Sequence, residues 1–169
     1  AGAALDEDTY RAAAAKNLAF LKASLWNAET TTLYHRWRDG ERDSVQLLEG
    51  YAFLLAGVIE LYETTLNADH LDFAIALAET MLAQTARDFM QKDILPKTAD
   101  ILKLNYEVIR ELMRKAGEIG LLAIEVPEEY GGLALGKVTG ALAAEISAME
   151  GSWAVPFMGH TGIGTLPIT

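Results

Sequence analysis

The sequence of 169 residues contains no cysteine, which excludes disulfide bonds, thiolate metal sites and cysteine nucleophiles together. It also has no apolar run of the roughly 18–20 residues that a membrane-spanning helix needs. No basic segment followed by an apolar one stands at the N-terminus, as a signal peptide would require. These absences predict a cytoplasmic protein without a membrane partner.

Basic residues are few. The chain has 14 Lys and Arg against 24 Asp and Glu, which gives a formal net charge of −10. No stripe of basic side chains could release counterions from a phosphate backbone, so we expect no nucleic-acid partner. The acidity is uneven, because residues 1–82 hold 6 basic and 13 acidic groups, whereas residues 83–169 hold 8 and 11.

Histidine is scarce as well, with only His35, His70 and His160. None is paired at the three- or four-residue spacing that puts two ligands on one helix face, so we predict no metal site. His35 is expected to be exposed, and His70 to lie in the first turn of a helix. His160 is expected at the surface or in an interface.

The remaining polar groups give no catalytic pattern. The adjacent carboxylates Glu128 and Glu129 point in different directions, which argues against paired acid–base work. Gly131-Gly132 is surrounded by neither a GxGxxG nor a Walker pattern. Three serines have no nearby His–Asp partners, although partners distant in the sequence stay open: Ser44, Ser147 and Ser152. The sequence predicts no catalytic, cofactor-binding or metal-binding residue.

Apolar side chains at three- and four-residue steps dominate the chain, and hydrophobic residues make up 51% of it. This pattern predicts an all-α protein, a bundle of about six helices. Asp6 or Asp8 is expected to cap the first helix and Asp69 the third. The predicted helices cover approximately Tyr10–Leu25, Leu47–Tyr62, His70–Leu95, Asn105–Ala116, Val138–Met149 and Trp153–Gly162. Pro156 is expected in the first turn of the last one.

One segment departs from the helical pattern. From Thr30 to Trp37 the residues are β-branched, aromatic or alternating, and Asp39-Gly40 is a strong tight-turn signal. We predict one short β-hairpin near residues 33–42. Several aromatic residues lie within or near it, and they are expected in the core or, alternatively, in a sugar-binding platform: Trp26, Tyr34, Trp37, Tyr51, Phe53 and Tyr62.

The stretches NLAFLKASLWNAETTTLYHRWRDGE, LLEGYAFLLAGVIELYETT and HLDFAIALAETM lie within about residues 8–79. They resemble part of the (α/α)6 toroid of thioredoxin-domain-containing proteins related to spermatogenesis-associated protein 20. The resemblance covers about three of twelve helices. It implies a ligand funnel that these helices alone cannot build.

The stretches TARDFMQKDILP, ELMRKAGEIGLLAIEVPEEYGGL and HTGIGTLPI occur in this order within residues 80–169. They resemble successive segments of the N-terminal helical domain of acyl-CoA dehydrogenases. In that family FAD is held mainly by the middle and C-terminal domains, and the catalytic base is a glutamate of the C-terminal domain. The resemblance places the helix around His160 beside the acyl pocket.

Two resemblances in one chain predict two domains, residues 1–79 and 80–169, joined through one continuous helix over about residues 70–95. The favoured interpretation is a non-enzymatic helical chimera, natural, recombined or designed, without a complete active site and without a cofactor. The first alternative is a partial acyl-CoA dehydrogenase module with residual affinity for acyl-CoA or FAD. The second is a carbohydrate-binding remnant of the toroid.

Both fragments carry apolar stripes that in their families pack against other elements. If the two fragments cover each other imperfectly, self-association would bury the remainder. We therefore expect a homodimer, with contacts from the C-terminal helix over residues 153–168, including Trp153, Val155, Phe157, Met158, Ile163 and Leu166.

Overall fold

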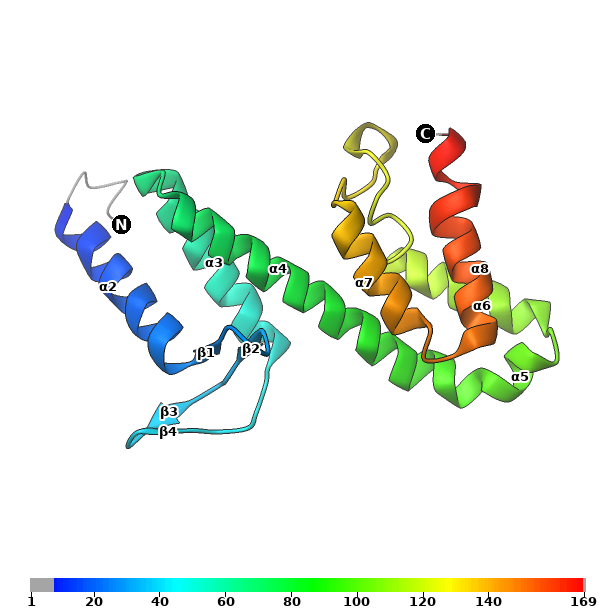
Figure 1. Cartoon of the computed structure of the whole chain (residues 1–169), viewed down its shortest axis with the longest axis horizontal. Coiled ribbons are helices and arrows are strands. Elements are labelled where there is room, and N and C mark those ends of the chain that lie inside the picture. The colour runs from blue at the N-terminus through cyan, green and yellow to red at the C-terminus, as the bar shows by residue number, and fades with distance from the viewer. Residues whose placement is uncertain (1–7, 169) are drawn as a thin grey trace. The chain divides into compact units, whose positions relative to one another are not determined.

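The computed structural model describes residues 8–168 and divides the chain into two compact units, residues 1–81 and 82–169 (Figure 1). Each unit has its own hydrophobic core. The fold is all-α, as the sequence predicts. In the described residues it has six helices of eight residues or more, together with shorter helical turns and two small strand pairs.

Unit 1 is built from α2 (Asp8–Ser24), α3 (Leu48–Thr65) and the first part of α4 (Ala68–Phe89). α3 ends because Leu66 adopts the left-handed conformation (φ 52°), and its N–H donates to the carbonyl oxygen of Tyr62 at 2.7 Å. The next helix is capped by Asn67, whose Oδ1 accepts the N–H of Asp69 at 3.0 Å. The predicted cap Asp69 is therefore inside the first turn. Asp6 lies outside the described residues.

The strands form two antiparallel pairs, where the sequence predicts a single hairpin. β3 (Trp37–Arg38) pairs with β4 (Glu41–Arg42) around Asp39-Gly40, within the predicted range. β1 (Trp26–Asn27) and β2 (Thr32–Leu33) form the additional pair. Their turn is closed by the Asn27 side chain, which accepts the N–H of Glu29 at 3.0 Å. Because this turn lacks an Asn-Gly or Asp-Gly signal, the sequence pattern missed it.

The core of unit 1 joins the three helices and β2. Trp26 packs edge-on against Phe73 of α4, with ring centroids 5.3 Å apart. The buried Tyr51 hydroxyl accepts the backbone N–H of Leu33 at 2.7 Å, which fixes the strand pair on α3. The buried side chains are Leu18, Leu33, Tyr51, Val58, Leu61, Phe73, Ala74 and Leu77.

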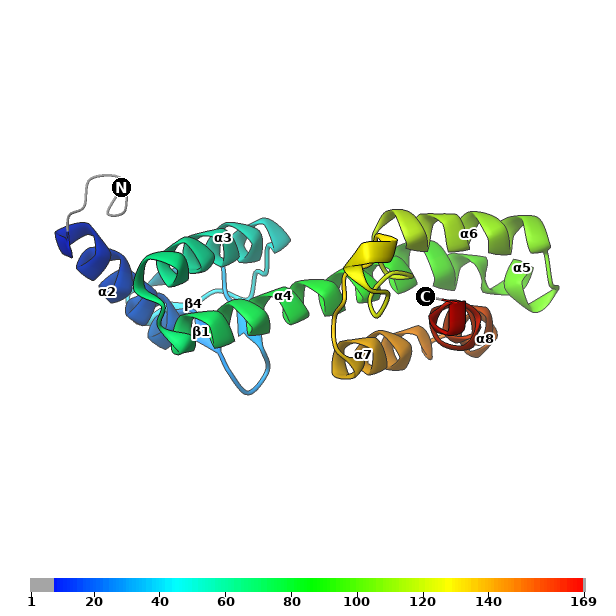
Figure 2. The ribbon, with the colours of Figure 1, turned by 90° about the horizontal axis from the view of Figure 1, so that it is seen from above.

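Unit 2 begins within α4 and contains three further helices of eight residues or more, α6 (Tyr106–Glu118), α7 (Lys137–Ser147) and α8 (Gly151–Met158). α7 and α8 lie side by side in both ribbon views (Figures 1 and 2). The connecting turns are η1 (Met90–Ile94), η2 (Leu95–Lys97), α5 (Thr98–Leu102), η3 (Glu128–Tyr130), η4 (Gly159–Gly164) and η5 (Leu166–Ile168).

The helix that the sequence places over about residues 70–95 is α-helical from Ala68 to Phe89, without a break between residues 78 and 86. It then widens into the π turn η1 and tightens into the 3-10 turn η2, which contains Pro96. Proline cannot donate a hydrogen bond, and in an α-helix its ring conflicts with the carbonyl four residues earlier. This explains why regular α-helical bonding ends before Pro96.

The core of unit 2 centres on Trp153, which is 1% exposed. Its ring lies 5.9 Å from that of Phe89 and 6.0 Å from that of Phe157. The core thereby joins α8 to the end of α4. The other buried members are Ala83, Ala86, Met90, Ile94, Ile101, Leu112, Ala116, Leu121, Ile124, Ala143 and Ile146.

Pro156 is not in the first turn of its helix, contrary to the sequence prediction. α8 begins at Gly151 rather than at Trp153, so Pro156 is the sixth helical residue and lies in the interior. The reason is the Glu150 side chain, whose Oε2 accepts the N–H of Trp153 at 2.6 Å. Glu150 is therefore the N-cap, and the helix begins at Gly151, two residues earlier than predicted. In residues 8–168 no helix is long and apolar enough to cross a membrane.

Candidate functional site

The three histidines are not brought together. His35 is exposed, and its backbone N–H donates to the carbonyl oxygen of Val45 at 3.0 Å. His70 lies in the first turn of α4, with its Nδ1 3.0 Å from the hydroxyl of Thr65. His160 is exposed within η4. The part of the chain that the structure describes holds no group of three or more His, Asp or Glu residues arranged for a metal ion.

The serines and paired carboxylates likewise form no reactive constellation. The buried Ser147 hydroxyl donates to the carbonyl oxygen of Ala144 at 2.7 Å, so it caps the end of α7. Ser44 is exposed, and Ser152 is half-buried in the first turn of α8. Glu128 and Glu129 are both exposed in η3. Of these residues, Ser147 therefore has a local structural role.

The aromatic residues near the hairpins do not form a single platform. Tyr51 and Trp26 are part of the unit 1 core. Trp37 stacks edge-on against Phe20 on the surface, with centroids 5.6 Å apart. Tyr34 lies beneath the guanidinium of Arg42. Phe53 is 72% exposed on α3.

The arrangement with the clearest chemical character is the apolar surface of α8 and η4. Trp153 and Phe157, four residues apart, point into the core of unit 2. Val155, between them, and Met158, directly after Phe157, face outward, with exposures of 73% and 49%. Ile163 continues this surface in η4 with 83% exposure. We refer to Val155, Met158 and Ile163 as the outer face.

Glycine and threonine shape the end of the outer face. The Thr161 hydroxyl donates to the carbonyl oxygen of Phe157 at 3.1 Å, which ties η4 to α8. A Cβ at Gly164 would lie 2.9 Å from the carbonyl oxygen of Gly159, so this turn accepts only glycine without a backbone shift. π turns of this kind often occur at functional sites. The GHTGIG sequence therefore fixes where Ile163 is presented.

The segment before α7 folds back on itself. Leu133 N–H donates to the carbonyl oxygen of Ala123 at 2.9 Å, and Leu135 N–H to that of Ile124 at 2.8 Å. Gly131 has φ +80°, and a Cβ at Gly132 would overlap the backbone of Val126. Both glycines are thus required by a close turn.

This glycine turn does not fit a diphosphate. The N–H of Gly131 donates to the carbonyl oxygen of Glu128 at 2.9 Å, and that of Gly132 donates to Pro127 at 3.1 Å. Both donors are therefore used within the turn, and two exposed carboxylates, Glu128 and Glu129, lie beside them. The negative phosphates of a dinucleotide such as FAD would meet repulsion here, so these residues do not fit that group.

Comparison with known proteins supports the second resemblance. Residues 77–169 match the family described as "Acyl-CoA dehydrogenase, N-terminal domain". The chain belongs to this family. Among similar proteins, a probable acyl-CoA dehydrogenase of Bacillus subtilis (strain 168) is 46% identical over 88 residues, which are 52% of this chain and 15% of that protein.

Two further similar proteins are also acyl-CoA dehydrogenases. The human mitochondrial short-chain specific acyl-CoA dehydrogenase is 40% identical over 74 residues, 43% of this chain and 18% of that protein. A Bacillus anthracis acyl-CoA dehydrogenase, solved in complex with FAD, shares 41% identity over 54% of this chain and 16% of its own, with a TM-score of 0.52. The chain thus spans less than a fifth of the length of these relatives.

These relatives overturn the favoured interpretation of the sequence. A chimera whose only specified property is its fold does not account for 46% identity to a B. subtilis protein. The alternative, a partial acyl-CoA dehydrogenase, is the better supported one, and it places the chain in an oxidoreductase family. The toroid resemblance of residues 1–79 stays a prediction.

Proposed function

We propose that this chain supplies the N-terminal helical domain of an acyl-CoA dehydrogenase, and that its outer face forms part of the apolar wall of the acyl-CoA site. The observation that carries the proposal is the exposure of Val155, Met158 and Ile163 on a helix whose inner side is fully buried. Support also comes from the acyl-CoA dehydrogenase resemblance, which implies a position beside the acyl pocket for this same helix.

The physical role of the outer face is binding and exclusion of water. Removal of apolar surface from water is favourable by about 25 cal/mol per Å² before the costs of association, and an acyl chain offers such a surface to Val155 and Ile163. A dry wall also strengthens the electrostatic interactions of groups that act on the substrate. Flavin chemistry and the base would come from domains that the matched segment does not include.

Rigid support of the outer face is consistent with this role. Glu150 caps α8, and the Trp153 and Phe157 rings anchor its inner side in the core. Two features of η4, the Thr161 hydrogen bond and the glycine at position 164, hold the turn that presents Ile163. A backbone held in this way needs little rearrangement when a ligand binds.

A domain exchange tests the proposal. The matching segment of the 46% identical B. subtilis enzyme would be replaced by residues 82–169, and flavin content and acyl-CoA oxidation would be measured. We expect the hybrid to retain FAD and to reduce an electron acceptor with butyryl-, isovaleryl- or palmitoyl-CoA. The relative rates would identify the acyl chain length.

Variants of the hybrid test the outer face. Val155→Asp and Ile163→Asp place a carboxylate against the acyl chain, and we expect KM to rise about tenfold or more with FAD content unchanged. Glu129→Gln, in the exposed turn η3, is the matched control. A hybrid that is folded and yellow but inactive with all three substrates would refute the domain assignment. Unchanged KM in both Asp variants would refute the wall.

A further inference from the structure

The sulfur atoms of the chain are unevenly exposed. The chain has five methionines and no cysteine, so thioethers are its only sulfur groups that an oxidant can attack. Met90 is 2% exposed in the core of unit 2, and Met81 and Met113 are half-buried. Met149 and Met158 differ from these three, because they are 48% and 49% exposed. Oxidation of the folded chain is therefore directed to two thioethers of unit 2.

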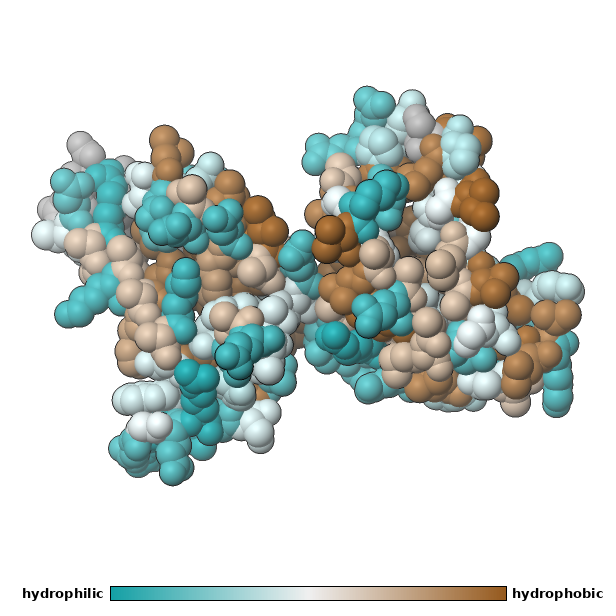
Figure 3. Space-filling model, in the orientation of Figure 1, coloured by the Kyte–Doolittle hydropathy of each residue, from teal (hydrophilic) through white to brown (hydrophobic). Residues whose placement is uncertain are grey.

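Met149 and Met158 have equal exposure but different surroundings. Met149 lies in the turn between α7 and α8, where its N–H donates to the carbonyl oxygen of Ile146 at 3.2 Å. Met158 is the last residue of α8 and belongs to the outer face, three residues after Val155 and so on the same side of the helix. Gly159 follows, and even a Cβ there would meet no atom within 4 Å. Figure 3 shows hydrophobic residues at the surface over α8 and η4.

Oxidation of a thioether by hydrogen peroxide is a two-electron step. A lone pair of Sδ attacks one peroxide oxygen, and the S–O bond forms while the O–O bond breaks. The leaving hydroxide takes the proton of the transferred oxygen and becomes water, so the thioether is oxidised to a sulfoxide and the peroxide is reduced. A methionine sulfoxide reductase reverses the change with two thiols, which form a disulfide while the oxygen leaves as water.

A sulfoxide at position 158 makes the outer face polar at its centre. The sulfoxide oxygen is a hydrogen-bond acceptor, whereas the side chains of Val155 and Ile163 have no donor to offer it. The Thr161 hydroxyl already donates to the carbonyl oxygen of Phe157 at 3.1 Å. An acyl chain that covers the sulfoxide removes its water without replacing the hydrogen bonds, which is unfavourable. Oxidation thus acts directly against apolar binding.

We propose that Met158 is a redox-sensitive position of the acyl-CoA site, where oxidation by hydrogen peroxide weakens binding of the acyl chain and a reductase restores it. This inference rests on the proposed function of the outer face. A bound acyl chain covers the Met158 thioether and protects it, so peroxide acts on the enzyme that is free of substrate. Met149 is oxidised as readily, because its exposure is equal, but its oxidation leaves acyl binding unchanged.

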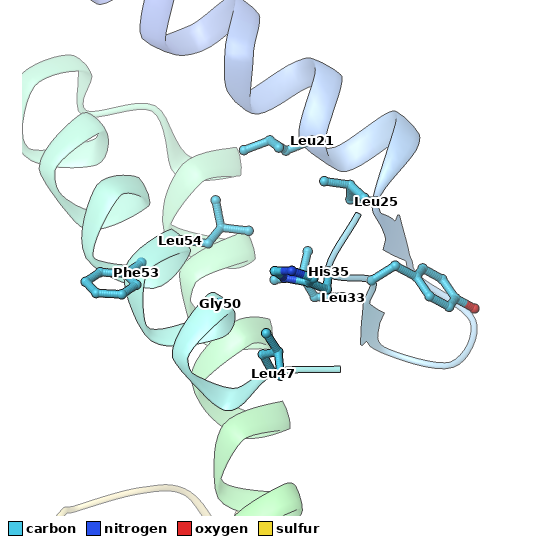
Figure 4. Close-up of a pocket in the computed structure, with 9 residues that line it drawn as sticks. Leu21, Leu25, Leu33, His35, Leu47, Gly50, Phe53 and Leu54 are labelled. Carbon is cyan, nitrogen blue, oxygen red and sulfur yellow. The ribbon is translucent and has the colours of Figure 1, made fainter. Parts of the chain in front are cut away.

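The first test treats the full chain with hydrogen peroxide and follows each methionine by mass spectrometry of its peptides. We expect Met149 and Met158 to be oxidised at similar rates, at least about tenfold faster than Met90. Unit 1 provides an internal control. Its apolar hollow of about 340 Å³, which Leu21 and Leu54 help to line (Figure 4), has no methionine among its lining residues. The amide NMR signals of those residues should stay unchanged, and circular dichroism should show that the helices persist.

The second test uses the hybrid enzyme that contains residues 82–169. Peroxide should raise KM for palmitoyl-CoA at least about fivefold with FAD content unchanged. Methionine sulfoxide reductase with dithiothreitol should then lower KM to its starting value. Palmitoyl-CoA present during the peroxide treatment should slow oxidation of Met158 at least about fivefold and leave that of Met149 unchanged.

Variants of the hybrid separate Met158 from every other group that peroxide oxidises. In Met158→Leu, KM should be the same before and after peroxide. Met149→Leu, the matched control, should keep the full response of the parent hybrid. Met158→Gln places a polar side chain of similar length on the outer face, and it should raise KM without any peroxide.

Three results would overturn the proposal. These are oxidation of Met158 as slow as that of Met90, a peroxide response that persists in Met158→Leu, and an unchanged KM after full oxidation of Met158. If KM is unchanged by oxidation but raised by Val155→Asp, the redox role is wrong and the acyl wall stands. If Val155→Asp and Ile163→Asp also leave KM unchanged, the wall is wrong and the redox role falls with it.

Discussion

The carboxylate of Glu150 accepts the backbone N–H of Trp153 at 2.6 Å, and the same residue pair sets where α8 begins and how its largest side chain enters the core. Glu150 is only 8% exposed, so little water competes for this hydrogen bond. The cap thus stabilises the first turn of α8, the helix that carries Val155 and Met158 of the outer face.

Removal of the cap should destabilise unit 2. Glu150→Ala leaves the N–H of Trp153 without its acceptor, and we expect a loss of about 1–2 kcal/mol in the free energy of unfolding by urea. Glu129→Ala, in an exposed turn, is the control and should change stability little. Equal stability of the two variants would show that the cap has no energetic role.

The turn at Gly132 should tolerate no side chain. In Gly132→Ala the new Cβ overlaps the backbone of Val126, and we expect about 1–3 kcal/mol of destabilisation because the turn must open. Gly159→Ala is the matched control, since its Cβ meets nothing within 4 Å and its backbone is helical. That variant should be neutral or slightly stabilised.

The ion pair between Lys115 and Asp93 should show a defined pH dependence. Nζ of Lys115 lies 3.0 Å from Oδ1 of Asp93 and joins α6 to the π turn η1. The hydrogen bond and charge of Asp93 raise the pKa of Lys115 above its ordinary 10.5. A raised pKa means that the stabilisation is complete below 10.5 and is lost as the pH rises through the folded-state value.

Asp93→Asn provides the corresponding measurement. We expect the pKa of Lys115, followed by NMR of its side chain, to fall towards the ordinary value in this variant. The stability difference between the variant and the parent should be constant near neutral pH and shrink in strongly alkaline solution. An unchanged Lys115 pKa would mean that the pair does not form in solution.

Self-association through the outer face stays a prediction, with a corrected set of contacts. Trp153 and Phe157 are buried in unit 2, so they cannot meet a second copy, whereas Val155, Met158 and Ile163 are exposed. We expect light scattering to detect a dimer that Ile163→Ser weakens. A strict monomer over a hundredfold concentration range would show this prediction to be wrong.

The sequence by itself determined the helical class and most of the helix positions. Apolar steps of three and four residues placed α3 around Leu47–Tyr62 and α6 around Asn105–Ala116, because helix periodicity depends only on local spacing. The segments from TARDFMQKDILP to HTGIGTLPI also indicated the acyl-CoA dehydrogenase family before any fold was known. Tight turns with an Asp-Gly signal were visible for the same local reason.

Only the tertiary structure decided which apolar residues are covered. Trp153 and Val155 are both large and apolar, yet the first is 1% exposed and the second 73% exposed, because packing against Phe89 selects one side of the helix. The strand pair at Trp26–Leu33 depends on the distant Tyr51 hydroxyl, and the position of Pro156 depends on the Glu150 cap. Such contacts join side chains whose spacing carries no periodic signal, so the outer face emerges only when the chain is folded.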